Sequence, residues 1–197
     1  MFPLGTVLFP TLVLPLHVFE ERYRALTRDC LAGAREFGVV LIERGSEVGG
    51  GDVRTDVGTV ARILEAEEMD DGRWVLATVG ARRIRVRDWL PDDPYPRAVV
   101  EPWGEPSAGD VDLDRVVALL RRVLALKAEL GEAAAPATID VSDDPVVGTF
   151  QIGALAPMNP LDHQRVLATE TAAERVGELE QLLTDVEETL TMRVEAG

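Results

Sequence analysis

Apolar positions follow two different patterns along the chain. Residues 1–103 hold short apolar runs separated by Gly, Pro and Asp, which is typical of strands joined by turns. From about residue 110 onward, apolar residues recur at the three-four spacing of amphipathic helices. A segment rich in Gly, Pro and Ser lies between the two parts at 104–109. We therefore predict a β-rich subdomain over residues 1–108 and a helical subdomain over residues 109–197 that packs on it.

The first part is predicted to form a small barrel of short strands. Strands are expected at residues 7–9, 12–16, 38–43, 57–68, 74–79, 83–89 and 97–103. A turn at residues 69–72 joins two of them into a hairpin, and residues 45–52 form a loop with three consecutive glycines. Strands closed by short turns favour a small barrel over a parallel layered sheet.

Helices are predicted from apolar periodicity and from capping residues. One helix occupies residues 20–32 within the first part and ends at Gly33. In the second part, residues 112–130 form a helix that ends at Gly131. Further helices begin at three capping positions, which are Ser142, Asn159 and the capping box Thr171-Ala-Ala-Glu174. The second part is therefore predicted to be a helical bundle, and the whole chain an α+β protein.

The charge balance restricts the kind of partner. Asp and Glu number 35 against 20 Lys and Arg, which gives a formal net charge of −15. Nucleic acids and anionic membranes are bound mainly through cationic side chains, so this balance opposes both. The apolar run at residues 4–19 follows no basic residue and is broken by Pro10 and Pro15, which does not fit a secretory leader or a bilayer span. We therefore expect a cytoplasmic location, no membrane partner and no nucleic-acid partner.

No residue pattern indicates catalysis, a cofactor or a metal. The only lysine, Lys127, lies within a predicted helix, where it completes neither a phosphate-binding loop nor a Ser–Lys dyad. The two histidines, His17 and His163, are far apart, and no Gly-x-Ser-x-Gly motif accompanies them. The single cysteine, Cys30, excludes an intrachain disulfide and a thiolate metal cluster. We therefore predict a protein that is not an enzyme and has no catalytic, cofactor-binding or metal-binding residues.

One basic cluster interrupts the acidic chain, formed by Arg82, Arg83, Arg85 and Arg87. The last three alternate with Ile84 and Val86, which indicates a strand with one apolar and one cationic face. The cluster fits either an anionic partner or cross-strand pairs with the carboxylates of the preceding hairpin. We favour the cross-strand pairs, whose acidic members are Glu65, Glu67, Glu68, Asp70 and Asp71.

The apolar run at residues 4–19 is the remaining candidate for function. Its apolar residues do not alternate, so a strand there carries apolar side chains on both faces; either both faces are buried or one binds a partner. Pro10 and Pro15 remove amide donors, which suits a strand at the edge of a sheet. We predict a weak binding surface for unfolded or extended polypeptide, formed by Phe9, Leu12, Leu14 and Phe19 and centred on the two leucines.

Several phrases of the sequence resemble, in order, the N-terminal substrate-binding domain family of Lon proteases. The opening phrase is Phe-Pro-Leu-Gly-Thr-Val-Leu-Phe-Pro-Thr-Leu-Val-Leu-Pro-Leu at residues 2–16, followed by Phe19 and by Tyr23-Arg24-Ala25-Leu26. Residues 56–63, the turn Asp71-Gly72 and residues 80–85 match the middle of the family pattern. The segment 155–183 resembles its helical part. The resemblance spans nearly the whole chain, and its motifs are specific in combination.

The resemblance implies a PUA-like pseudo-β-barrel followed by a C-terminal helical bundle. In Lon proteases this region recognises unfolded or tagged substrates for an ATP-driven protease, whereas these 197 residues include neither the ATPase nor the Ser–Lys peptidase. It therefore implies a free-standing bacterial module that binds unfolded polypeptide or a protein partner, as an adaptor in proteolysis or quality control. The alternative is a nucleic-acid-binding PUA-like protein, which the net charge opposes. The resemblance carries over no catalytic residue.

Overall fold

The computed structural model describes residues 1–45, 51–108 and 111–196, and the chain divides into two compact units, Met1–Gly104 and Glu105–Gly197. The subdomain boundary predicted between residues 108 and 109 involves Gly109, which lies outside the described residues, as does most of the predicted glycine-rich loop at 45–52.

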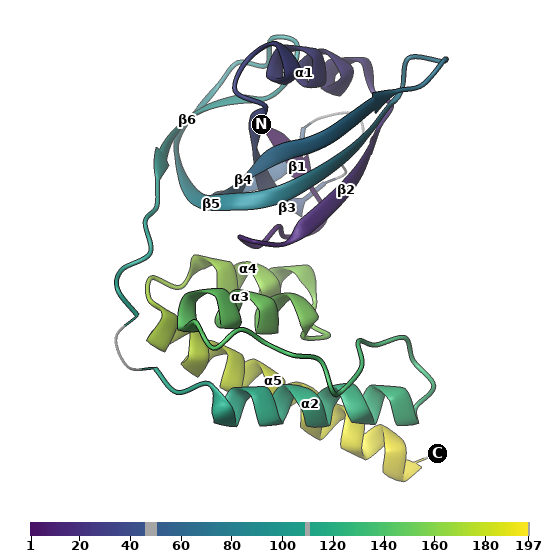
Figure 1. Ribbon diagram of the computed structural model, residues 1–197, viewed down its shortest axis with the longest axis vertical. Coiled ribbons are helices and arrows are strands. Elements are labelled where there is room, and N and C mark those ends of the chain that lie inside the picture. The colour runs from purple at the N-terminus through teal and green to yellow at the C-terminus, as the bar shows by residue number, and fades with distance from the viewer. Residues whose placement is uncertain (46–50, 109–110, 197) are drawn as a thin grey trace. The chain divides into compact units, whose positions relative to one another are not determined.

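The first unit contains six strands and one helix among its described residues. The elements are β1 (Phe2–Leu4), β2 (Val13–Val18), α1 (Glu21–Ala32), β3 (Glu36–Arg44), β4 (Val53–Glu68), β5 (Trp74–Leu90) and β6 (Arg97–Pro102). The sheet has the order β1-β3-β4-β5-β2, and β6 also pairs with β5. β1 runs parallel to β3, and the other pairs are antiparallel. The long strands β4 and β5 curve strongly, so the sheet curls around its own interior (Figure 1).

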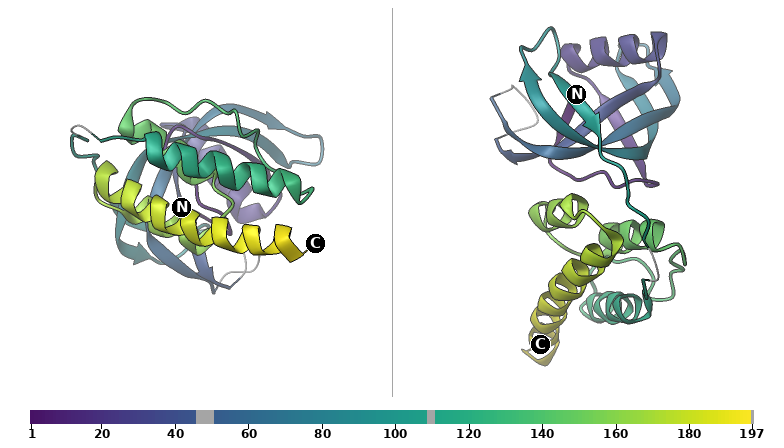
Figure 2. Two further views of the ribbon diagram at one scale, coloured as in Figure 1. Left: turned by 90° about the horizontal axis from the view of Figure 1, so that it is seen from below. Right: turned by 90° about the vertical axis from the view of Figure 1, so that its left-hand side faces the viewer.

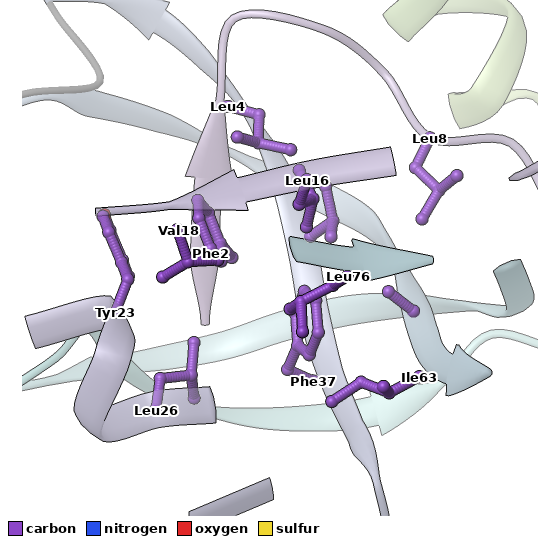
Figure 3. Packing of buried hydrophobic residues seen from close by; sticks show 12 residues of the cluster. Phe2, Leu4, Leu8, Leu16, Val18, Tyr23, Leu26, Phe37, Ile63 and Leu76 are labelled. Atoms are coloured by element: carbon purple, nitrogen blue, oxygen red, sulfur yellow. The ribbon is translucent and has the colours of Figure 1, made fainter. Parts of the chain in front are cut away.

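The inner face of this sheet and the buried side of α1 form one hydrophobic core. Figure 3 shows side chains from β1, β2 and α1 meeting those of β3, β4 and β5. Within it, the rings of Phe2 and Tyr23 stack with their centroids 4.1 Å apart and their planes 10° from parallel. Burial of this aromatic pair fixes β1 against the start of α1. The labelled members of the core are Phe2, Leu4, Leu8, Leu16, Val18, Tyr23, Leu26, Phe37, Ile63 and Leu76.

The predicted strand positions agree with the structure for most of the sheet but are wrong at the amino terminus. Residues 7–9 form no strand, whereas Phe2–Leu4 does, because parallel pairing with Val39, Val40 and Leu41 of β3 gives this short segment its ladder. The segments predicted as separate strands at 74–79 and 83–89 form one continuous strand, β5. The helix predicted at 20–32 is confirmed as α1, with Gly33 as its C-cap.

The arginine row pairs within the protein, although not with the predicted carboxylates. Arg82 contacts Glu36 at 2.8 Å and Arg87 contacts Glu101, while Arg83 is buried with its guanidinium 4.2 Å from the ring centroid of Trp103. Within the part of the chain that the structure describes, no ion pair joins this row to the hairpin carboxylates. The sheet register explains the difference, because it places Arg82, Arg83 and Arg85 opposite residues 57–60 of β4 instead of the acidic end of that strand.

A close backbone approach positions the chain that enters β2. The amide of Gly80 donates to the carbonyl oxygen of Leu12 at 2.9 Å, and the amide of Thr11 donates to the carbonyl oxygen of Gly80 at 2.8 Å. Thr11 adopts a left-handed conformation with φ 70°, which bends the chain onto β5. A Cβ atom at position 80 would overlap the carbonyl oxygen of Phe9. Glycine is therefore required there so that the two backbones can meet.

The second unit is helical. Its elements are α2 (Asp114–Glu129), α3 (Pro145–Leu155), α4 (Pro160–Ala168) and α5 (Ala172–Ala196). Figure 2 shows α2 lying alongside α5, and α3 and α4 also pack on α5. Apolar side chains from these helices make the core of the unit, with Val116, Leu120, Val123, Ile152, Val166, Leu179 and Leu183 fully enclosed. The prediction of a helical bundle after the strands is confirmed in these elements.

Capping side chains set three of these helix starts. Asn159 accepts hydrogen bonds from the amides of Leu161 and Asp162, as predicted. Thr171 and Glu174 form the predicted capping box: the amide of Glu174 donates to Thr171 Oγ1 at 3.1 Å, and the Glu174 carboxylate accepts from the amide of Thr171 at 3.0 Å. The prediction for Ser142 was wrong by two residues. Asp144 is the N-cap of α3, because its carboxylate reaches two amides of the first turn while Ser142 Oγ accepts only from the amide of Asp144.

Arg175 is the polar centre of the helical unit. Its side chain has no exposed surface, although it lies in the first turn of α5. The guanidinium donates to Thr149 Oγ1 at 3.0 Å and to a carboxylate oxygen of Glu105 at 3.0 Å, and its carbon lies 3.8 Å from the ring centroid of Phe150. Arg175 therefore joins α5, α3 and the segment that precedes α2 through one side chain.

The stability of the helical unit is expected to depend on pH through His163. It lies in the first turn of α4, and its Nε2 is 3.1 Å from the carbonyl oxygen of Ala156. Burial lowers the pKa of the His163 imidazole below the ordinary value of 6.5. The folded state then binds a proton less readily than the unfolded state, so the free energy of unfolding falls as the pH drops below 6.5.

We expect His163→Gln to reduce this acid sensitivity, because glutamine retains a hydrogen-bond donor but does not titrate. Denaturant unfolding of both proteins at about pH 7.5 and about pH 5.5 checks this. The difference in unfolding free energy between the two pH values should be smaller for the variant. An equal difference in the two proteins would show that His163 does not contribute.

Candidate functional site

The strand β2 lies at one end of the sheet order. Among the described residues it pairs only with β5, in antiparallel register from Val13 opposite Val79 to Val18 opposite Trp74. The carbonyl oxygen of Leu12 accepts from the amide of Gly80, whereas the amide of Leu12 donates to Phe9, so Leu12 faces β5 through its carbonyl group. Alternation along the strand then turns the main-chain groups of Leu14 and Leu16 toward β5 as well. Thr78 Oγ1 donates to the carbonyl oxygen of Leu14 at 2.7 Å, which agrees with that oxygen pointing toward β5.

The intervening residues of β2 direct their main-chain groups away from β5. These residues are Val13, Pro15 and His17, at the non-hydrogen-bonded positions of the pair. Proline at such a position removes no hydrogen bond from the β2–β5 ladder, which explains why Pro15 is tolerated within a strand. The carbonyl groups of all three residues and the amides of Val13 and His17 therefore line what we call the outer edge of β2.

The side chains of β2 alternate between the core and the surface. Leu16 and Val18 are buried, and Leu14 is half-buried against the same core. On the opposite face, Val13 is 65 % exposed, Pro15 and His17 are also exposed, and Phe19, just after the strand, is 58 % exposed. We call these four residues the β2 face. Two large apolar side chains therefore remain in contact with solvent on one short strand and its continuation.

A pocket of about 200 Å³, the edge pocket, lies where β1, β2 and the start of α1 meet. Figure 3 shows β2 crossing β1 here, with Phe2, Leu16 and Val18 gathered near the crossing. Burial raises the pKa of Tyr23, which also lines the pocket, to about 12, so its phenol stays neutral at physiological pH. The apolar lining consists of Phe2, Leu4, Pro15, Leu16, Val18, Phe19 and Tyr23. Such a lining suits an apolar group.

A second, smaller pocket extends the apolar surface around Phe19. It has a volume of about 80 Å³ and lies between the end of β2 and the turn that joins β4 to β5. Met69 and Trp74 line it together with Phe19, and Met69 is itself exposed. Flexible Met and rigid aromatic side chains are common on surfaces that bind varied apolar partners.

The exposed side of the sheet carries acidic residues on β4, the neighbour of β5 on the side away from β2. The register places Glu65 in the same row as Ala77 and Pro15, and Glu67 in the same row as Val75 and His17. Residues opposite one another in neighbouring strands share a face, so the two carboxylates border the side of the sheet that carries the β2 face. Both glutamates are exposed, and neither forms an ion pair with another residue that the structure describes.

The four residues predicted as a binding surface differ in their exposure to solvent. Phe19 is exposed, Leu12 and Leu14 are half-buried, and Phe9 is buried at 2 % exposure. Val13, which the prediction omitted, is the most exposed large apolar side chain of the run. The sequence held one signal for this arrangement: Pro15 and His17 occupy alternate positions with Val13 and mark the outward face. Whether this surface binds polypeptide remains a prediction.

The residues considered for chemistry lie apart from one another. Burial raises the pKa of the Cys30 thiol, whose Sγ is 3.3 Å from the carbonyl oxygen of Glu36, so the thiol is protonated at neutral pH. Lys127 contacts Glu132 at 3.4 Å in the helical unit, and His17 is exposed on β2. Over the ranges described, no group of three or more His, Cys, Asp or Glu side chains is arranged to hold a metal ion. None of the helices in those ranges is both long and apolar enough to cross a membrane.

The profile of the family described as the ATP-dependent protease La (LON) substrate-binding domain matches residues 1–185. The chain belongs to this family. A crystal structure of a Lon N-terminal domain protein from Xanthomonas campestris has 28 % sequence identity and a TM-score of 0.65, over 93 % of this chain and 95 % of that chain. The predicted α+β fold, a PUA-like pseudo-barrel followed by helices, is therefore confirmed.

Curated relatives of the Lon family are much longer than this sequence. Lon protease 2 of Herpetosiphon aurantiacus is 27 % identical over 92 % of this chain but only 23 % of its own length. Lon protease of Anaeromyxobacter dehalogenans is 33 % identical over 66 % of this chain and 16 % of its own length. The N-terminal domain of the Mycobacterium avium complex Lon protease, at 18 % identity and a TM-score of 0.61, shares the fold. The chain thus spans less than a quarter of these two curated Lon proteases.

Proposed function

We propose that this chain is a non-catalytic recognition module for unfolded or extended polypeptide, and that it acts as an adaptor in proteolysis or quality control. The observation that carries the proposal is the match of residues 1–185 to a family described as a substrate-binding domain. The β2 face supports it, because Val13 and Phe19 offer apolar surface to a partner whose own apolar residues are exposed by unfolding.

The proposed affinity is weak. A small apolar surface must offset the conformational entropy that a flexible chain loses when it is held, so dissociation constants on the order of micromolar are expected. The excess of carboxylates favours unfolded chains with a positive net charge and opposes nucleic acid. Titration of single-stranded and double-stranded DNA at low salt tests the nucleic-acid alternative directly, and micromolar binding there would support it.

The double variant Val13→Asp, Phe19→Asp should weaken polypeptide binding by about tenfold or more, because it replaces exposed apolar contacts with charges that must be desolvated. The probe is lysozyme kept unfolded by reduction and carboxamidomethylation, and the readout is fluorescence anisotropy of the labelled chain. Because both positions are exposed, the thermal unfolding midpoint should change little.

The matched control is Val99→Asp on β6, since Val99 is 51 % exposed and lies outside the β2 face. It adds one charge to the same unit and should leave binding within about twofold. Equal weakening by both variants would assign the effect to charge alone. Unchanged binding by the double variant would place the polypeptide surface elsewhere and remove the β2 face from the proposal.

A further inference from the structure

We propose that the outer edge of β2 holds its polypeptide as an additional β-strand, so that recognition uses the main chain of the guest. This inference deepens the proposed function and rests on it. Val13 and His17 each present an amide and a carbonyl group away from β5, and Pro15 between them presents a carbonyl group, so acceptors recur at every alternate residue and donors at the two ends. An extended polypeptide has main-chain donors and acceptors at the same spacing, so the hydrogen-bonding groups of this edge match a polypeptide strand as the occupant.

The edge pocket gives the added strand a place for one side chain. An added strand beside β2 places alternate side chains toward the interior, on the side of Leu16 and Val18, and the others toward the β2 face. The edge pocket lies along the outer edge itself, because residues from both faces of β2 line it. Leu16 and Val18 contribute from the inward face, and Phe2 and Leu4 of β1 line it as well. Its volume of about 200 Å³ accommodates one apolar side chain. Main-chain hydrogen bonds therefore allow polypeptides of many sequences to bind, and the pocket adds a preference for an apolar residue at one position of the bound strand.

Charge complementarity narrows the occupant to segments with basic residues. Glu65 and Glu67 border the exposed side of the sheet in the rows of Pro15 and His17, without ion pairs to other described residues. They lie two strands away from the outer edge, a separation of about 10 Å, so they attract the guest through the solvent without direct contact. An apolar segment flanked by arginine or lysine is therefore favoured over one flanked by acidic residues.

The experiment compares three peptides of one sequence. The parent is a nonapeptide of alternating leucine and threonine with an arginine at each end. Two derivatives carry N-methyl groups on the amides of either the leucines or the threonines. An added strand turns the amides of only one set toward β2, so methylation of that set should weaken binding by about tenfold, and methylation of the other set by less than about twofold. Equal effects of the two derivatives would overturn strand addition.

A pair of protein variants tests the same inference from the other side. His17→Pro removes one amide donor from the outer edge, whereas His17→Ala retains it and removes only the exposed side chain. Binding of the parent peptide should weaken by about fivefold in His17→Pro and stay within about twofold in His17→Ala. Thermal unfolding of both variants verifies that the unit remains folded. If His17→Pro unfolds, binding of the N-methylated peptides to the unaltered protein is the test of strand addition.

The outcomes separate this inference from the proposed function. If neither unfolded lysozyme nor the parent peptide binds, both are wrong. If both bind but methylation position has no effect, polypeptide recognition stands and strand addition is wrong. If sedimentation shows a dimer that His17→Pro dissociates, the occupant is a second copy of this chain, which also overturns the inference. Replacing the terminal arginines of the peptide with glutamates should weaken binding by a few fold at low salt, and no change would remove the charge preference.

Discussion

Replacement of Arg175 by alanine is expected to lower the free energy of unfolding of the helical unit by about 3 kcal/mol. The guanidinium is wholly enclosed and holds Glu105, Thr149 and the ring of Phe150. Burial lowers the pKa of Arg175, but a guanidinium remains charged at neutral pH, so the native state depends on these partners to solvate it. Removing the side chain leaves a cavity and separates α5 from α3 and from the segment before α2.

Denaturant unfolding followed by circular dichroism at 222 nm measures this loss, because most of the helix lies in this unit. Glu105→Gln is the matched control: it retains the size of the side chain and removes only the charge, so a smaller loss of about 1 kcal/mol is expected. The double variant gives the coupling between the two residues. A loss below about 1 kcal/mol for Arg175→Ala would show that the guanidinium is dispensable for stability.

Replacement of Gly80 by alanine is expected to destabilise the β-rich unit by about 2–3 kcal/mol. The added methyl group would overlap the carbonyl oxygen of Phe9, a main-chain atom that has no alternative rotamer. Either the segment from Phe9 to Leu12 moves away from β5, or β5 shifts, and both changes disturb the hydrogen bonds that join Gly80 to Thr11 and Leu12. Because that contact leads directly into β2, polypeptide binding should weaken as well.

Gly104→Ala is the control for this prediction, because no atom other than those of Gly104 and its two chain neighbours lies within 4 Å of a Cβ at that position. Its unfolding free energy should change by less than about 0.5 kcal/mol. Thermal and denaturant unfolding of the two variants side by side gives the comparison. Similar stability of Gly80→Ala and Gly104→Ala would mean that the chain at Phe9 adapts without cost.

The sequence predicted the periodic parts of the fold because local patterns determine them. The capping box at Thr171, the Asn159 cap and helix α1 each depend on residues within a few positions of one another. The parallel ladder between β1 and β3 joins residues more than thirty positions apart, and no local pattern announces such pairing. The same holds for Arg175, whose partners Glu105 and Thr149 are remote in sequence.

The candidate site was predicted in its segment but not in its side chains. The proline positions correctly suggested a sheet edge, since Pro15 sits on an end strand of the sheet order. The apolar run did not indicate which face of the strand is buried, because leucine and valine occur on both faces. Pairing with β5 resolves this by turning Leu16 and Val18 into the core and Val13 outward. Register with a distant strand, which sequence alone does not contain, therefore determines which residues meet a partner.

Pro15 also bears on self-association. An exposed strand edge is a template on which copies of the same protein can stack into aggregates. At the centre of the outer edge, Pro15 offers a carbonyl oxygen but no amide, so a long regular strand from another copy would lose a hydrogen bond in the middle of the ladder. A short guest can leave that position unpaired and dissociate quickly. Pro15 therefore opposes regular edge-to-edge pairing between copies of this chain, and it also limits the hydrogen bonds that the proposed guest strand can form with this edge.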